Sequence, residues 1–213
     1  DDRVILEKGC IEKLIDCWNN NSDKNIVGIG LNQIVSKNKP KFDGSIVSNI
    51  FKNYQGRVLI NGLNIGYQNL KKNSKVSWLK GGMASYNIKK IKEIKKRSFP
   101  IVSWSVCEDL IFSYDLQKHK TLIICKNAKA KLIQRSKKAE SIKNGYELGK
   151  LYSHNFRYFV KKNDNLSFIL FIFTILILFF YGMLTGIMNF SLKKINYSFG
   201  LIAGLFSKNL FNN

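Results

Sequence analysis

An uncharged apolar run near the end of the chain constrains its fold more than any other feature. Residues 166–190 contain no charged side chain, and the first one after them is Lys193. A helix needs about 20 consecutive apolar residues to cross a bilayer core roughly 30 Å thick. Because a core helix of a soluble protein seldom stays uncharged over such a length, the run predicts one transmembrane helix.

Basic residues on both flanks of the run bear on its orientation. Three precede it and two follow it, namely Arg157, Lys161, Lys162, Lys193 and Lys194. Lysine and arginine are enriched on the cytoplasmic side of membrane helices. The larger basic side therefore predicts a single-pass protein of the inner cell membrane, with residues 1–165 in the cytoplasm. The tail, residues 191–213, is too short to span again, and we expect a short amphipathic or re-entrant segment there.

Helical and extended patterns alternate along the part of the chain that precedes the run. We expect helices at residues 9–19, 88–97 and 108–118, and strands at residues 25–31, 57–63 and 121–125. Strands that alternate with helices favour an α/β layered domain, here over residues 1–140. A further helix at about residues 142–160 carries its apolar side chains on one side. Within the segment 141–165, this helix is expected to lie along the membrane surface.

The charge balance of the chain is strongly basic, with a formal net charge of +21. Such a charge attracts polyanions, which include phosphate-bearing ligands, acidic lipid headgroups and nucleic acid. The chain is also rich in Lys, Asn and Ile together, so codon usage is an alternative explanation for part of the charge. Its four cysteines form no CxxC pair and no metal-ligand spacing with the two histidines, which is typical of reduced thiols in a cytosolic domain.

Three groups of residues are candidates for chemistry. They are the acids Asp1 and Asp2 beside a strand, the glycines Gly81 and Gly82 after Trp78, and the acids Glu108 and Asp109 at a helix start. Taken singly, each group has a structural explanation. Adjacent acids are usually solvated, a glycine pair usually forms a turn, and acids in the first turn of a helix are favoured by the helix dipole.

The order of these groups along the chain is more informative than any one of them. Acids beside a strand are followed by W-L-K-G-G-M-A, then by C-E-D-L-I-F-S, and then by a helix that ends in R-Y-F-V-K-K-N before the apolar run. This order resembles glycosyltransferase family 2, and it is similar to the C-terminal part of a bacterial membrane-attached member. The resemblance implies a partial nucleotide-diphospho-sugar transferase (GT-A-like) layer, and therefore a fragment of a longer protein.

The resemblance also implies a metal site. In the family, an acidic motif at a strand end holds a divalent cation, Mg²⁺ or Mn²⁺, against the diphosphate of the sugar donor. The matching residues are Asp1, Asp2 and Arg3, and the arginine stands where many relatives have a third acid. Two alternatives follow: Asp1 and Asp2 hold the cation, or Arg3 itself offsets the phosphate charge.

The remaining candidates match the acceptor side of the family's site. Gly81 and Gly82, with Trp78, match the loop that approaches the acceptor. Asp109 matches the catalytic base, which deprotonates the acceptor hydroxyl as it attacks the anomeric carbon. Glu108 is expected to help place the acceptor.

The expected partners follow from the same resemblance. They are a nucleotide-sugar donor, a glycan or lipid-linked acceptor and acidic membrane lipids, and no nucleic acid is expected. The Q-x-x-R-W sequence of processive polysaccharide synthases is absent, which favours transfer of single sugars. Two other hypotheses stay open: a non-catalytic basic module tethered to the membrane that binds polyanions, and an inactive truncated transferase.

Overall fold

The computed structural model describes residues 4–21, 25–35, 52–94, 107–132 and 144–207. The chain divides into two compact units. The first contains residues 1–58, 64–98 and 109–135, and the second contains residues 59–63, 99–108 and 136–213.

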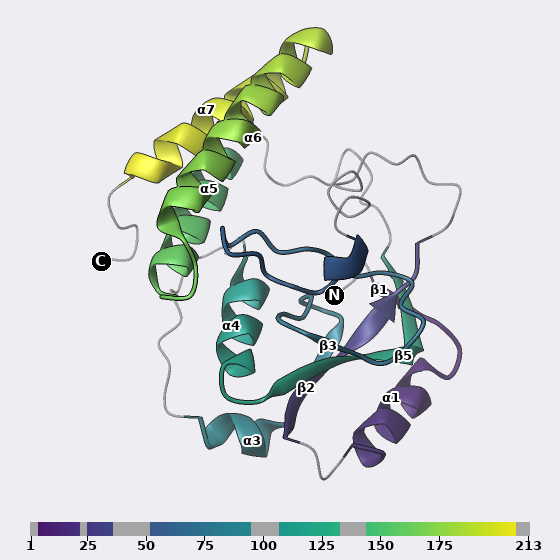
Figure 1. The fold of residues 1–213 in the computed structure, drawn as a ribbon. Helices are drawn as coiled ribbons and strands as arrows, with labels where there is room; N and C mark the ends of the chain where they lie inside the picture. Colours follow the sequence, from purple (N-terminus) through teal and green to yellow (C-terminus); the bar gives the residue numbers. More distant parts are fainter. Residues whose placement is uncertain (1–3, 22–24, 36–51, 95–106, 133–143, 208–213) are drawn as a thin grey trace. The chain divides into compact units, whose positions relative to one another are not determined.

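The first unit is built on a mixed sheet of five strands (Figure 1). The strands are β1 (Val4–Leu6), β2 (Ile26–Gln33), β3 (Ser74–Val76), β4 (Ala84–Tyr86) and β5 (Thr121–Leu132). The long strand β5 pairs in parallel with β2, which in turn pairs antiparallel with β4. On the other edge of β5, β3 pairs with its first half and β1 with its last residues, both antiparallel.

Two hydrophobic clusters cover the two faces of this sheet, because neighbouring residues of β5 point to opposite sides. Ile123 and Cys125 belong to the cluster that packs against helix α1 (Cys10–Asn19). Leu122 and Ile124 belong to the cluster that contains Leu116 of helix α4 (Glu108–Gln117). Both faces of the sheet centre are therefore buried by protein.

Two glycines of β2 allow this second cluster to approach the sheet closely. A Cβ atom at Gly28 would lie 2.9 Å from side-chain atoms of both Leu79 and Leu122. A Cβ at Gly30 would lie 2.6 Å from Ile124 and 2.8 Å from Leu79. Leu79, the residue two positions before the pair Gly81-Gly82, is fully buried as a result.

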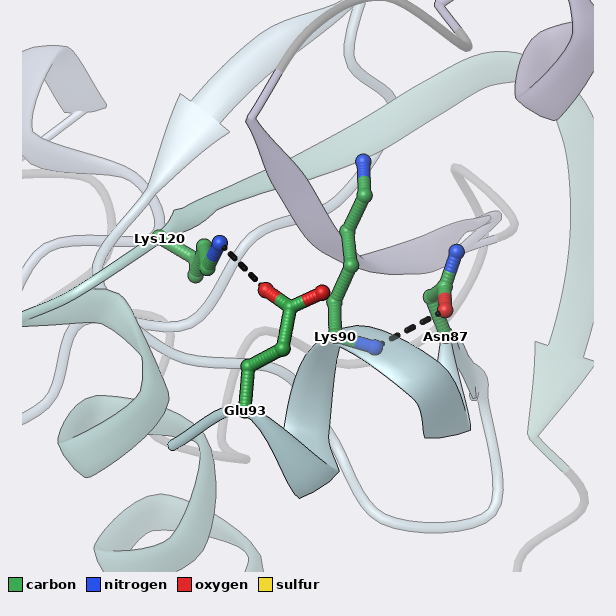
Figure 2. A network of polar contacts seen from close by, with 4 residues as sticks. All are labelled: Asn87, Lys90, Glu93 and Lys120. Atoms are coloured by element: carbon green, nitrogen blue, oxygen red, sulfur yellow. Dashed lines mark hydrogen bonds and ion pairs between the residues drawn. The ribbon is translucent and has the colours of Figure 1, made fainter. Parts of the chain in front are cut away.

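The short helix α3 (Ile88–Lys92) follows β4 directly. The Asn87 side chain caps its start by accepting a hydrogen bond from the Lys90 backbone N–H at 3.1 Å. Just after the helix, Glu93 forms an ion pair with Lys120 at 2.9 Å, next to the first residue of β5 (Figure 2). The described part of the predicted helix 88–97 is therefore shorter than expected, and its last three residues lie outside the described chain.

The sequence patterns correctly indicate a mixed α/β fold, with helices at α1 and α4 and strands at β2 and at the start of β5. The predicted strand at residues 57–63 is wrong. Only an isolated bridge joins Val58 to Asn64, and the residues between them form a turn in which Gly62 has a φ of 83°. Asn61-Gly62 is a turn-forming dipeptide, because glycine adopts positive φ without steric cost.

In its described residues, the second unit contains three helices and the turn at residues 59–63. The helices are α5 (Gly145–Lys161), α6 (Phe168–Met188) and α7 (Leu192–Phe206). Among the described residues, α6 is the one helix long and apolar enough to cross a membrane, with a mean hydropathy of 2.6. Large apolar side chains along α6 are exposed, for example those of Phe173, Ile177 and Phe180. A helix that is apolar on all sides suits a lipid environment.

Helix α7 packs along both of its neighbours in this unit. Close approaches pair Gly145 with Lys193 and Gly204 with Lys150, so α7 runs in the same direction as α5. Arg157 of α5 donates hydrogen bonds to the carbonyl oxygens of Leu205 and Ser207 and so satisfies the C-terminal end of α7. The tail beyond the apolar run thus forms a helix over Leu192–Phe206. The interfacial location expected for residues 141–165 and 191–213 stays a prediction.

Candidate active site

Asp109 and the glycine pair lie together in the first unit, although they are 28 residues apart in the sequence. The backbone N–H of Gly81 donates a hydrogen bond of 2.8 Å to Asp109 Oδ2. The other carboxylate oxygen, Oδ1, accepts a hydrogen bond of 2.9 Å from the Leu110 backbone N–H. The carboxylate is therefore fixed by one bond to the loop and one to its own helix, while the side chain remains partly exposed.

Ser113 holds the start of α4 against the loop that carries the glycines. Its buried hydroxyl donates to the Asp109 carbonyl oxygen at 2.6 Å and accepts from the Leu79 backbone N–H at 2.9 Å. The loop then turns at Gly82, whose φ of 72° favours glycine. At Gly81 an added Cβ would lie 3.2 Å from the Asp109 Cβ, so a side chain there would crowd the acid.

Lys80 carries a positive charge near enough to Asp109 for the two groups to interact electrostatically. Its Nζ donates to the Tyr67 carbonyl oxygen at 2.9 Å, contacts Gln33 Oε1 and lies 4.6 Å from the centre of the Tyr67 ring. Its backbone N–H donates to the Tyr67 hydroxyl at 2.9 Å. Burial lowers the pKa of Lys80 to about 8, and the negative charge of Asp109 partly opposes that shift.

Two phenols complete the surroundings of Asp109. Burial raises the pKa of Tyr67 above its usual range, and the charge of Asp109 adds to the effect. The pKa of Tyr86 is raised in the same way, again first by burial and then by Asp109. Both phenols therefore stay protonated at neutral pH. The site offers one carboxylate as a proton acceptor, with an amine and two hydroxyl groups nearby.

Trp78, which precedes the glycine pair, is buried and packs against residues 65–67. Its side chain is 6% exposed, its indole N–H donates to the Ile65 carbonyl oxygen at 3.2 Å, and its ring packs on Tyr67 at 5.8 Å. The predicted contact between Trp78 and an acceptor stays a prediction, as does the role of Glu108, whose side chain is exposed. Asp1, Asp2 and Arg3 lie outside the described residues, and the described strand β1 begins directly after them at Val4.

A metal site is therefore not tested by the structure. Within the described ranges, no group of three or more His, Cys, Asp or Glu side chains is arranged to hold a metal ion. The predicted ligands Asp1 and Asp2 lie outside these ranges. The divalent cation remains an expectation from the resemblance.

Four residues of the site had no role in the sequence-based prediction, namely Lys80, Tyr67, Tyr86 and Ser113. Lys80 stands inside the W-L-K-G-G motif, so its position next to the glycines was visible in the sequence. Ser113 is the last residue of the C-E-D-L-I-F-S motif, whereas Tyr67 and Tyr86 belong to no motif. The roles of all three follow only from the path of the chain. Neither protein-family models nor curated proteins give a match to this chain.

Proposed function

We propose that this chain is the C-terminal part of an inverting glycosyltransferase. It would move a sugar from a nucleotide-sugar donor to a glycan or lipid-linked acceptor at the cytosolic face of the membrane. The observation that carries this proposal is the hydrogen bond between the Gly81 backbone N–H and Asp109, because the residues that the resemblance assigns to acceptor binding and to catalysis share one site.

The geometry of Asp109 suits a general base. Each carboxylate oxygen already accepts one backbone N–H, and each retains a further lone pair for another donor. An acceptor hydroxyl would give its proton to this carboxylate while its oxygen attacks the anomeric carbon. The bond from that carbon to the diphosphate would break on the opposite face, so the nucleoside diphosphate leaves with the electron pair and the configuration inverts.

Positive charge is needed where the diphosphate leaves. The cation expected at Asp1 and Asp2 would supply this charge when bound. Lys80 contributes a cation whose charge interacts with that of Asp109, and burial both removes water from this cation and lowers its pKa to about 8. A poorly solvated cation interacts more strongly with a nearby anion than one in bulk water does.

Helix α6 supports the membrane part of the proposal. It is 21 residues long, and its exposed surface is apolar. The basic residues Lys161 and Lys162 precede it and would lie near the headgroups of acidic lipids. A transferase held in this way would meet an acceptor that is itself attached to lipid.

The net charge of +21 favours a second candidate, a non-catalytic membrane-tethered module that binds polyanions. Binding of that kind weakens steeply with added salt and discriminates little between ligands. Specific donor binding would instead discriminate between nucleotides at constant salt. An inactive, truncated transferase would keep the fold without turnover.

Replacing Asp109 by asparagine tests the proposal. In the intact protein in membranes, transfer from a panel of nucleotide sugars is followed by release of nucleoside diphosphate. Loss of a general base should lower turnover by about 10²–10⁴-fold, while donor binding measured by calorimetry stays nearly unchanged. The matched control is Asp16→Asn, which removes the same charge from the exposed surface of α1.

Unchanged turnover in Asp109→Asn would remove Asp109 as the base. Equal losses in both variants would indicate a general charge effect. An intact protein without turnover on any donor, whose binding to polyanions falls with salt, would favour the second candidate.

A further inference from the structure

A basic pocket lies in the first unit, apart from the glycine pair and Asp109, none of which lines it. Its volume is about 440 Å³. It lies where β2 ends, between the segment around Asn69 and the middle of β5. The polar part of its lining consists of Asn32, Asn69, Lys71, Lys126, Asn127 and Lys129, and no Asp or Glu of the described residues lines it.

A bulge in β5 creates one wall of the pocket. Leu31 of β2 pairs with Cys125, but the next residue, Asn32, pairs with Lys129, so Lys126 and its two successors are left out of the ladder. In a regular strand, side chains three positions apart point to opposite faces. The bulge instead brings Lys126 and Lys129 to the same pocket, as bulges commonly re-aim side chains near functional sites.

Asn32 fixes this wall to the opposite one. Its side chain is 2% exposed and uses both ends of its amide. The Nδ2 group donates to the carbonyl oxygens of Leu70 at 2.9 Å and Lys126 at 3.1 Å, and Oδ1 accepts from the Leu70 backbone N–H at 2.9 Å. The pocket is therefore framed by hydrogen bonds that do not depend on a ligand.

The segment opposite is fixed as well. The Asn69 backbone N–H donates to the Gln33 carbonyl oxygen at 2.8 Å, and its side chain bonds the backbone of Val35. Asn73 accepts a hydrogen bond of 2.9 Å from the Lys126 backbone N–H. With both walls fixed, little conformational freedom is lost when a ligand binds.

The three lysines of the pocket are exposed and have no ion-pair partner within the part of the chain that the structure describes. Other lysines nearby do have one: Lys131 pairs with Glu7 at 3.2 Å, and Lys120 pairs with Glu93. Three ammonium groups around one pocket repel each other unless an anion lies between them. Lysine binds phosphate as a point charge, and asparagine amides can donate to phosphate oxygens.

We propose that this pocket, lined by Lys71, Lys126 and Lys129, binds a phosphate group. The ligand would be either a soluble diphosphate compound or the phosphate headgroup of a lipid. This proposal does not depend on Asp109 acting as a base, and it would hold for a non-catalytic protein too.

Titration of the full chain in detergent with inorganic pyrophosphate, at constant ionic strength, tests the proposal by calorimetry. A second titration uses dihexanoyl phosphatidic acid below its critical micelle concentration. The variant replaces Lys71, Lys126 and Lys129 by glutamine. Its matched control replaces Lys8, Lys13 and Lys89 by glutamine. These three lysines are also exposed and do not line this pocket, and their replacement removes the same charge.

The pocket variant should bind at least one probe about 10-fold or more weakly than the unaltered chain. The affinity of the control variant should stay within about twofold of the unaltered chain, because distant surface charges are screened by salt. A loss for pyrophosphate would assign the pocket to a soluble ligand, and a loss restricted to phosphatidic acid would assign it to a lipid headgroup. Equal losses in both variants would overturn the proposal, because they would indicate non-specific attraction. Failure of the unaltered chain to bind either probe would overturn it as well.

Discussion

Replacing Gly200 by alanine should force helices α5 and α7 apart. A Cβ atom at this position would overlap the carbonyl oxygen of Tyr146 and would lie 2.9 Å from the backbone nitrogen of Lys150. Ordinary contact begins at 3.4 Å, so the nitrogen alone requires a shift of about 0.5 Å, and the carbonyl requires more. Both atoms belong to the backbone of α5, so no change of rotamer can relieve the overlap.

The expected magnitude combines two opposing effects. Overpacking a close interface typically costs about 1–3 kcal/mol, and the rigid backbone contact places Gly200 in the upper part of that range. Alanine is a better helix former than glycine by about 1 kcal/mol. The net loss in the free energy of unfolding should therefore be about 1–2 kcal/mol, which corresponds to a fall of about 2–8 °C in melting temperature for a chain of this size.

Thermal unfolding of the full chain in detergent, followed by circular dichroism at a helix-sensitive wavelength, measures this change. Gly66→Ala is the control, because nothing lies within 4 Å of a Cβ at that glycine. It should not lower the melting temperature. If Gly200→Ala melts at or above the temperature of the unaltered chain, the close packing of α5 on α7 is refuted, because the gain in helix propensity would then act alone.

A double variant tests the same packing more stringently. Gly149 lies on the facing helix, where a Cβ would overlap the carbonyl oxygen of Tyr197 and lie 3.0 Å from the nitrogen of Leu201. One separation of the helices accommodates both added methyl groups. The double variant Gly149→Ala/Gly200→Ala should therefore lose less stability than the two single variants together. Additive losses would indicate that the two glycines do not share one interface.

Two further predictions concern Lys80 and helix α6. The folded-state pKa of Lys80 is about 8 against 10.5 for an unperturbed lysine, so between these values the unfolded chain binds a proton that the folded chain lacks. The free energy of unfolding, measured with urea, should therefore rise between pH 8 and 10.5 by more in the unaltered chain than in Lys80→Met. If the two proteins show the same dependence on pH, the buried position of Lys80 is contradicted. Ile177→Arg places a charge on the exposed centre of α6. Inserting such a charge at the centre of a membrane helix costs about 2.5–3.5 kcal/mol, so the variant should increase the fraction of the protein extracted from membranes by alkaline carbonate. Leu192→Arg, just beyond α6 and beside Lys193, is the control and should leave extraction unchanged.

Much of the first unit could be predicted because its patterns are local. The buried strand β2 and the helices α1 and α4 coincide with apolar runs or helical spacing. The second half of β5 was missed although its sequence, A-K-A-K-L, alternates small apolar and charged residues. In the structure Ala128 and Ala130 are buried, while Lys129 and Lys131 are exposed. Alternation with alanine in place of larger side chains is a weak pattern, because alanine is also common in helices.

The basic pocket lined by Lys71, Lys126 and Lys129 could not be predicted from the sequence. Its lining depends on the register between Asn32 and Lys129, which skips three residues of β5. Strand register is set by how the two faces pack, and a shift of one residue would turn every side chain over. No local pattern reports such a shift.

The sequence by itself determined the apolar helix α6 and the presence of a mixed α/β unit, because both depend on residues close together in the chain. It also singled out Asp109 and the glycine pair as candidates. Only the tertiary structure decided that Asp109 bonds Gly81, that Ser113 joins their two segments, and that Lys80 reaches Gln33 across 47 residues. The physical reason is that these contacts depend on the path of the whole chain, which composition and periodicity do not encode.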